Sequence, residues 1–352
     1  MKDARPARLA VCLLAAATIA AACSGQSRQT PPAGGAAAIQ LVGAGSTFDY
    51  PLFSRAFYQY SRLHPNVSVN YQSIGSGGGI QQFTKKTVDF GATDVPMGSK
   101  ELAAIEGGAG AVIQIPVALG GVVIAYNVPG APPHLRLTPD VLAAIYLGTI
   151  RDWSDPAIAK LNPQAKLKSL PIIVVHRADG SGTTYIFTDY LSAVSPQWQS
   201  TSGKGKTVNW TAPSAVGAKG NEGVAGQIRN APGAIGYIEL SYAMQNDIPF
   251  VALQNKAGAF VLPMLDSVKA AAASKASVSA RDFSIVNQPG ANAYPIAGYS
   301  WALLYRHYPD AAKQKALDDL FGWLLTDGQQ YAAPVDYVPL PQNVANGAAR
   351  AL

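Results

Sequence analysis

Cysteine is almost absent from this chain of 352 residues, which contains only Cys12 and Cys23. Both lie near the N-terminus, in or next to a segment that we expect to be removed or modified. The mature chain then has no free thiol and no disulfide, so burial of an apolar core must stabilise it. Histidine is also scarce, and the 4 histidines do not follow a metal-binding spacing such as His-Glu-x-x-His. We therefore predict no metal site.

Charge is sparse as well. Asp, Glu, Lys and Arg make up 14% of the chain against 48% apolar residues, a composition typical of a globular protein and not of a disordered one. The net charge of +6 is spread without blocks of Lys or Arg. No stripe of interleaved aromatic and basic residues is available for bases to stack on, so we predict no nucleic-acid partner.

The sequence lacks the motifs of common hydrolases and nucleotide-binding enzymes. It has no Gly-x-Ser-x-Gly nucleophile elbow. The glycine-rich turn 75–79 lacks the Gly-Lys-[Ser/Thr] that ends a P-loop. Gly203–Thr207 does contain Gly-Lys-Thr, but no predicted strand precedes it, and we interpret it as a solvated basic loop. We predict that the chain is not an enzyme and uses no cofactor.

The N-terminus has the layout of a secretory signal peptide. Residues 1–22 carry a basic start and then a small, apolar stretch that is shorter than the ~20 residues needed to span a bilayer. The stretch ends in Ala20-Ala21-Ala22-Cys23, which resembles a lipobox, although Leu is more usual than Ala at position 20. We predict cleavage before Cys23 and lipidation of its sulfur, with residues 23–38 as a flexible tether to a membrane. The alternative is an ordinary cleaved signal peptide beside an unmodified cysteine.

Three times in the chain, a predicted strand leads into a turn of small polar residues and then a predicted helix. Free backbone N–H groups at such helix starts, together with the helix dipole, favour a bound anion. Each hydroxyl could instead be a plain helix N-cap, which is the common role of Ser and Thr at this place. The three turns are Gly43–Phe48, with Ser46 or Thr47 as caps, Ser73–Gly79, and His176–Thr184, with Ser181 or Thr183 as caps.

Two charged side chains stand out near these turns. Arg177 offers a planar fork of donors suited to an oxyanion, and Asp179 can hold the other side of the guanidinium. Asp94 follows the short strand 88–93, at the carboxyl end where ligands bind in open α/β sheets. Asp94 is thus either a turn cap or a carboxylate that faces a ligand cleft.

The order of predicted elements indicates two α/β domains. The apolar run 111–128 is interrupted by Gln114 and Pro116, which favours two buried strands over a membrane span. We expect the chain to leave the first domain near 122–125 and to return near 293–296. Two such crossings make a hinge beside a cleft.

Taken together, these motifs resemble the phosphate-binding protein family of the bacterial high-affinity ABC phosphate importer. The matching segments occur in family order and cover nearly all of the predicted mature chain. Ser46, Thr93 and Tyr294 stand where Ala, Ser and Trp are usual in the family. The matching segments are 43–48, 74–78, 89–94, 120–123, 145–148, 177–183 and 232–237.

The resemblance implies an α/β, two-lobed type II periplasmic-binding-protein fold with two crossover hinge segments. Lobe I is then 39–122 plus 296–352, and lobe II is 123–295. Asp179 would orient Arg177. The implied partners are phosphate and the importer's permease subunits with their cytoplasmic ATPase. The protein is expected to be a monomer, exported to the periplasm or cell surface and anchored through Cys23. The implied phosphate-binding residues are Thr47, Phe48, Ser76, Asp94, Arg177, Ser181, Gly182 and Thr183.

A carboxylate in an anion site needs a physical reason. Ionised Asp94 can only accept hydrogen bonds. Phosphate in its HPO₄²⁻ and H₂PO₄⁻ forms can donate one, whereas sulfate cannot, and sites that require a ligand hydroxyl reject analogues without it by roughly 10⁴–10⁵. We therefore expect Asp94 to select phosphate over sulfate. The alternatives are a binding protein for another oxyanion, such as sulfate or molybdate, and a phosphoester hydrolase that uses Ser181 or Ser76.

Overall fold

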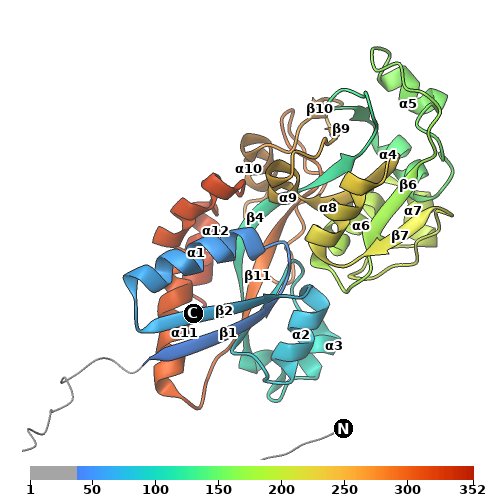
Figure 1. Ribbon diagram of the computed structural model, residues 1–352. Coiled ribbons are helices and arrows are strands. Elements are labelled where there is room, and N and C mark those ends of the chain that lie inside the picture. Colours follow the sequence, from blue (N-terminus) through green and yellow to red (C-terminus); the bar gives the residue numbers. More distant parts are fainter. Residues whose placement is uncertain (1–37) are drawn as a thin grey trace, which may run out of the picture. The chain divides into compact units, whose positions relative to one another are not determined.

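The computed structural model describes residues 38–352, in which helices and strands alternate along most of the chain (Figure 1). Within these residues, no helix has both the length and the apolar composition to cross a membrane. The predicted signal peptide, tether and Cys23 lie outside the described residues, apart from Ala38. The first elements are β1 (Ile39–Gly45), α1 (Tyr50–Leu63), β2 (Val67–Ser73), α2 (Ser76–Thr84), β3 (Phe90–Thr93), α3 (Ser99–Ala103), η1 (Gly108–Ala111), β4 (Val112–Tyr126), β5 (Arg136–Leu137), α4 (Pro139–Tyr146) and α5 (Pro156–Leu161). The later elements are β6 (Ile173–Arg177), α6 (Gly182–Val194), α7 (Pro196–Thr201), β7 (Ala215–Ala218), α8 (Gly220–Asn230), β8 (Ala234–Glu239), α9 (Leu240–Gln245), β9 (Ala252–Gln254), β10 (Phe260–Val261), α10 (Leu265–Ala273), β11 (Ala297–Tyr305), α11 (Ala311–Leu324), η2 (Asp327–Tyr331), η3 (Ala333–Val335) and α12 (Gln342–Ala349).

The described residues contain one large mixed sheet of 8 strands, in the order β2-β1-β3-β11-β4-β8-β6-β7. β1 runs parallel to both β2 and β3, and β6 runs parallel to β7 and β8. β11 (Ala297–Tyr305) lies antiparallel between β3 and β4, although both of these strands end before residue 127 of the chain. The parallel groups place the carboxyl ends of β1, β2 and β3 together, which is where such sheets bind ligands.

β4 is a single strand of 15 residues, so the prediction of two strands between 111 and 128 is wrong. The interruption at Pro116 is absorbed by a bulge in β4 itself, because Trp301 and Ser300, which are adjacent in β11, pair with Pro116 and Ala118 and leave Val117 as the extra residue. A bulge at this place accommodates a residue that cannot donate a ladder hydrogen bond. β4 pairs with β11 as far as Gly121 and with β8 from Val122 onward. One continuous strand therefore belongs to two groups of strands.

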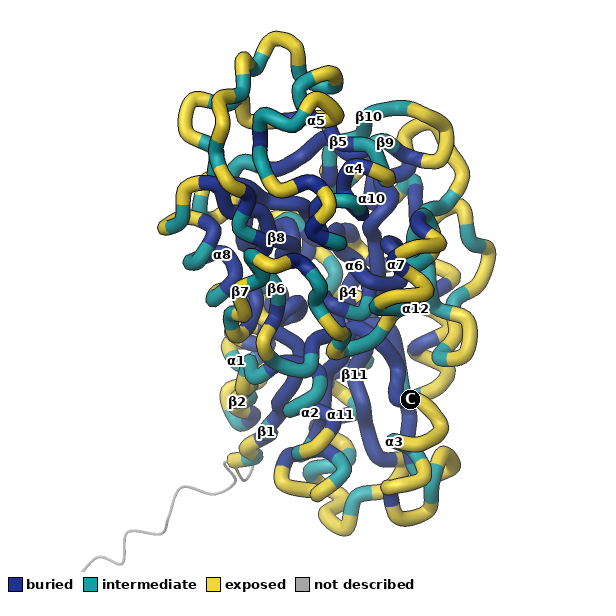
Figure 2. The backbone as a smooth tube through the Cα atoms, turned by 90° about the vertical axis from the view of Figure 1, so that its right-hand side faces the viewer, coloured by how far each residue is buried: buried dark blue, intermediate teal, exposed yellow. Residues whose placement is uncertain are grey.

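Apolar side chains on the two faces of the sheet form separate clusters. On one face, Phe57 of α1 and Phe321 of α11 pack with the strand residue Phe90. On the other face, Phe83 of α2 packs with Tyr305 of β11. Figure 2 shows β4 and β11 buried along nearly their whole length between these layers. This burial on both faces explains their continuous apolar sequences.

The predicted strand–turn–helix units are present as β1–α1, β2–α2 and β6–α6. Ser181 is the N-cap of α6, and its Oγ accepts the N–H of Thr184 at 3.0 Å. The prediction that Ser46 or Thr47 caps α1 is wrong. That helix begins after Asp49, whose side chain makes no capping hydrogen bond.

Candidate functional site

The turns after β1, β2, β3 and β6 meet in the interior of the protein. They carry all the residues that the sequence predicts to bind phosphate. Gly182 is buried with them. The other predicted residues are at most 4% exposed, namely Thr47, Phe48, Ser76, Asp94, Arg177, Ser181 and Thr183. Hydroxyls, backbone N–H groups, a carboxyl group and a guanidinium are thus gathered out of contact with solvent.

Asp94 lies at the centre of this cluster. Its Oδ1 accepts hydrogen bonds from Ser46 Oγ at 2.5 Å and from Ser300 Oγ at 2.7 Å. Its Oδ2 accepts one from Thr183 Oγ1 at 3.2 Å. Burial raises the pKa of Asp94, while the three hydroxyls and the charge of Arg177 oppose that rise.

Arg177 is held in place by Asp179. Its Nε donates to Asp179 Oδ1 at 2.8 Å, and a second guanidinium nitrogen pairs with Asp179 Oδ2. The remaining nitrogen lies 3.5 Å from Thr183 Oγ1, a weak contact that leaves donor capacity inside the cluster. Burial alone would raise the pKa of Asp179, but the hydrogen bonds and charge of Arg177 outweigh it and the pKa is lowered. The predicted orienting role of Asp179 agrees with this geometry and stays a prediction.

The turns after β2 and β6 approach each other backbone to backbone. Ser76 Oγ accepts the N–H of Gly182 at 3.0 Å, and Gly77 N donates to Gly180 O at 2.8 Å. Gly75 has a φ of 89°, and a Cβ there would lie 2.1 Å from Asp179 Oδ2. Only glycine fits such a position without displacing the acid.

Thr47 and Phe48 contact the cluster from the turn after β1. Thr47 Oγ1 accepts two hydrogen bonds from Asn221, at 2.7 Å from the side chain and 3.1 Å from the backbone. Phe48 N donates to Ser46 Oγ at 2.9 Å. Ser181 differs from the other residues, since its hydroxyl is engaged as the cap of α6. The structure therefore joins every predicted residue except the Ser181 hydroxyl in one hydrogen-bonded network.

Several members of the network were not predicted as site residues. Asn221, in the first turn of α8, links Thr47 to Thr183. Ser300 lies in the middle of β11 and was overlooked because the surrounding sequence is apolar. The isolated polar residue in a buried strand was the available signal, since such a group must find a partner.

Two further buried acids lie beside Asp94. Among the described residues, no group hydrogen-bonds to either carboxylate oxygen of Asp49. Burial and the nearby Asp94 raise the pKa of Asp49, and the Ser300 hydroxyl partly opposes that rise. Burial likewise raises the pKa of Glu239, although Tyr337 and a backbone N–H bond to its Oε2. Burial therefore shifts both acids toward the neutral form.

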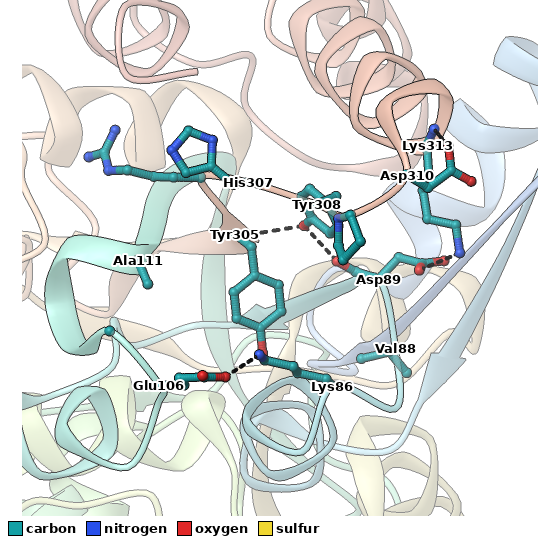
Figure 3. Close-up of a pocket in the computed structure, with 13 residues that line it drawn as sticks. Lys86, Val88, Asp89, Glu106, Ala111, Tyr305, His307, Tyr308, Asp310 and Lys313 are labelled. Atoms are coloured by element: carbon teal, nitrogen blue, oxygen red, sulfur yellow. Dashed lines mark hydrogen bonds and ion pairs between the residues drawn. The ribbon is translucent and has the colours of Figure 1, made fainter.

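A pocket of about 560 Å³ lies elsewhere, between the end of β11 and the turn before β3 (Figure 3). None of the predicted phosphate-binding residues lines it. Four of its charged residues form ion pairs, Lys86 with Glu106 and Lys313 with Asp89. Of the other two, Arg306 donates to Gly110 O and Asp310 caps α11. The Tyr308 hydroxyl donates to the backbone oxygen of Asp89. These satisfied groups offer no set of converging donors comparable with the cluster around Asp94.

Comparison with known proteins identifies the relatives of this chain. A model of the PBP superfamily domain matches residues 30–327. The phosphate-binding protein PstS of Pasteurella multocida is 45% identical over 307 residues, which cover 86% of this chain and 87% of the relative. The PstS of Methanocaldococcus jannaschii is 38% identical, with 96% and 92% covered.

Solved structures share the fold. A phosphate-binding protein from Stenotrophomonas maltophilia superposes with a TM-score of 0.71 at 20% identity, covering 89% of this chain and 93% of that one. The periplasmic phosphate-binding protein PfluDING gives a TM-score of 0.70 at 21% identity, with the same coverage. The predicted type II periplasmic-binding-protein fold is thereby confirmed. The chain belongs to the PBP superfamily and, within it, to the family of the phosphate-binding protein PstS.

Proposed function

We propose that this chain binds inorganic phosphate between two lobes and delivers it to the permease subunits of an ABC phosphate importer with a cytoplasmic ATPase. The relatives named phosphate-binding protein PstS support this function. Since the chain belongs to a family of binding proteins, it is not an enzyme, as its sequence predicts. The phosphate contacts come from Thr47, Phe48, Ser76, Asp94, Arg177, Ser181, Gly182 and Thr183.

The proposed lobes are 39–122 with 296–352, and 123–295. The partner change of β4 supports this division, because it falls at Gly121 and Val122. Val122 N also bonds to Ile296 O at 2.8 Å, so the two crossings lie side by side. A small twist of these adjacent segments would separate the turns after β2 and β6 and admit the anion.

The proposal rests on one observation. The Asp94 carboxylate, which accepts hydrogen bonds from hydroxyls, lies in the same buried cluster as the guanidinium of Arg177, which Asp179 holds in place. Arg177 supplies positive charge and directed donors, and helix starts add backbone N–H groups. Asp94, kept ionised, accepts a hydrogen bond from a protonated oxyanion and repels an unprotonated one. Phosphate carries such a proton near neutral pH, and sulfate does not. The site therefore binds phosphate in preference to sulfate.

Calorimetric titration of ligand-free protein with phosphate and sulfate, at one ionic strength, tests this function. The wild-type protein should bind phosphate one to one and give no heat with sulfate. Asp94→Asn, which can donate a hydrogen bond, should reduce the phosphate-to-sulfate affinity ratio at least a hundredfold. Exposed Asp247→Asn is the matched control and should change nothing. Equal binding of both anions by the wild type, or an unchanged ratio in Asp94→Asn, would refute the proposed selectivity.

Export and anchoring form a second part of the proposal. Cleavage after residue 22 and lipidation of Cys23 would place the monomeric protein in the periplasm or on the cell surface, tethered by residues 23–38 to a membrane. The lipobox-like sequence before Cys23 supports this. In cells fed labelled fatty acid, the full chain and Cys12→Ala should be labelled and found in membranes. Cys23→Ala should be unlabelled; labelling of that variant would contradict lipidation at Cys23.

A further inference from the structure

We propose that Ser46 and Ser300 are positioning residues that keep the Asp94 carboxylate charged and present its Oδ2, and not its Oδ1, to the proton of bound phosphate. The inference rests on the proposed function, because it concerns the carboxylate that selects the ligand. It assigns that selectivity to two side chains beyond the predicted contact residues.

The hydrogen bonds of Asp94 are unequally divided between its two oxygens. Oδ1 accepts two short bonds, at 2.5 Å from Ser46 and 2.7 Å from Ser300, which fill the two lone pairs of that oxygen. Oδ2 has a single, longer contact of 3.2 Å with Thr183 Oγ1. The same Thr183 Oγ1 faces Arg177. The acceptor capacity that remains on Asp94 is therefore directed toward the guanidinium that would bind the anion.

The fold explains why two serines reach one oxygen. Asp94 follows β3, and the strands on either side of β3 are β1 and β11. Ser46 follows β1, and Ser300 lies within β11 opposite Ala118, beside the bulge that Val117 forms in β4. A bulge disrupts the ladder locally and can re-aim a side chain. Both serines are at most 1% exposed, so water does not compete for their hydroxyls.

The charged and titratable groups around Asp94 come from several elements. Arg177 of β6 favours the charged form of Asp94. Asp49 before α1 and Glu239 at the end of β8 are acids that would oppose it if ionised. The hydroxyl of Tyr71 in β2 donates to Ser46 O, and burial together with the nearby Asp49 and Asp94 raises its pKa. The Ser300 hydroxyl is close enough to Asp49 to lower the pKa of that acid, but its hydrogen bond goes to Asp94 Oδ1. Asp49 thus receives no hydrogen bond from the described residues, whereas Asp94 receives three from hydroxyls. Of this pair of acids, Asp49 therefore holds the proton and Asp94 the charge.

Removal of either serine hydroxyl destabilises the ionised form of Asp94. Protonated Asp94 can donate a hydrogen bond, so it tolerates sulfate. A hydrogen bond to a charged group is worth about a factor of ten or more in such an equilibrium, which corresponds to roughly one pH unit. Sulfate binding should thus appear about one pH unit higher in Ser46→Ala and Ser300→Ala than in the wild type.

The test is calorimetric titration with phosphate and with sulfate from pH 5 to pH 8, with thermal unfolding as the check on folding. Ser46→Ala and Ser300→Ala should each lower the phosphate-to-sulfate ratio roughly tenfold at mildly acidic pH. The control is Ser267→Ala. Ser267 is a buried serine outside the cluster around Asp94, and its hydroxyl donates to the nearby Leu262 O. This variant should keep the wild-type pH profile.

Ser46→Ala and Ser300→Ala test the positioning role independently, so one of them is sufficient if the other does not fold. A wild-type pH profile of selectivity in the folded serine variants, combined with lost selectivity in Asp94→Asn, would overturn the positioning role and leave the proposed function standing. Unchanged selectivity in Asp94→Asn as well would overturn the proposed function itself.

Discussion

At the scale of single residues, the guanidinium of Arg177 is fixed by the paired contacts with Asp179. A planar fork can satisfy Asp179 on one side and an oxyanion on the other. The ammonium group of lysine is a point charge and cannot do both in the same geometry. A lysine at position 177 would therefore keep the positive charge but would not bind the anion as arginine does.

We expect Arg177→Lys to weaken phosphate binding by roughly thirtyfold, or about 2 kcal/mol, because a charge-assisted bidentate contact is lost. Calorimetry measures the change. Arg229→Lys is the control, since the Arg229 side chain is exposed and, among the described residues, donates only to Asn246. Wild-type affinity in Arg177→Lys would mean that Arg177 serves only as a charge.

The close approach of Gly182 to Asp94 gives a second prediction about a single residue. A Cβ at this position would lie 2.5 Å from Asp94 Cβ and 2.6 Å from Asp94 N. Gly182→Ala should therefore push the turn after β6 away from Asp94 and weaken phosphate binding at least tenfold. The matched control is Gly226→Ala in α8, where an added Cβ meets nothing within 4 Å. Equal phosphate affinity in both variants would show that this close approach is not needed for binding.

At the scale of elements, the loop after α7 connects the ligand turn to α3. Lys206 O accepts the N–H of Ser181 at 2.9 Å, while Lys206 Nζ forms an ion pair with Glu101 of α3. The loop 203–207, which we interpreted as solvated, thus makes contacts with the rest of the protein, and the side chain of Lys206 is only 23% exposed. This ion pair joins the two proposed lobes outside the binding site.

We expect Glu101→Gln to weaken phosphate binding several-fold at low salt, because it removes a contact that favours the closed arrangement. The effect should shrink as salt is raised. Glu106→Gln, which removes the exposed ion pair with Lys86, is the control and should leave binding unchanged. A loss of affinity that is independent of salt would indicate that the Glu101 charge is not responsible.

The elements that sequence predicted well are those with local signals. The helices α2 and α6 were predicted from the glycine and serine turns before them, and these turns also revealed the candidate site. Both helices begin earlier than predicted, at Ser76 and Gly182, so the last residues of the predicted turns are helical. β4 was predicted as two strands because its continuity depends on pairing with β8 and β11, which are more than 100 residues away. Ser300 and Asn221 were missed as site residues for the same reason. Their roles arise from contacts that no local pattern encodes.

At the scale of the whole molecule, buried acids make stability depend on pH. In an unfolded chain, Asp49 ionises near pH 4. In the folded protein, burial and Asp94 raise its pKa, so the folded state binds more protons than the unfolded state between the two pKa values. The free energy of unfolding must therefore fall as pH rises through this window, by up to about 1.4 kcal/mol per pH unit for each such group.

Asp49→Asn removes this titration while preserving the shape of the side chain. We expect the free energy of unfolding of the ligand-free variant to depend less on pH between 5 and 8 than that of the wild type. Urea unfolding at several pH values measures this, with exposed Asp247→Asn as the control. An unchanged slope in Asp49→Asn would mean that Asp49 is ionised in the folded protein.

The insertion of β11 between β3 and β4 has a consequence for synthesis on the ribosome. A nascent chain that has passed β4 but not residue 297 leaves β3 and β4 with unpaired edges in the middle of the sheet. Such edges pair readily with other chains, which exposes the unfinished polypeptide to aggregation and proteolysis. Asp94 also lacks Ser300 until β11 emerges. Phosphate can therefore not act as a template for the growing chain, and only a nearly complete translation product acquires the stabilisation that the ligand provides.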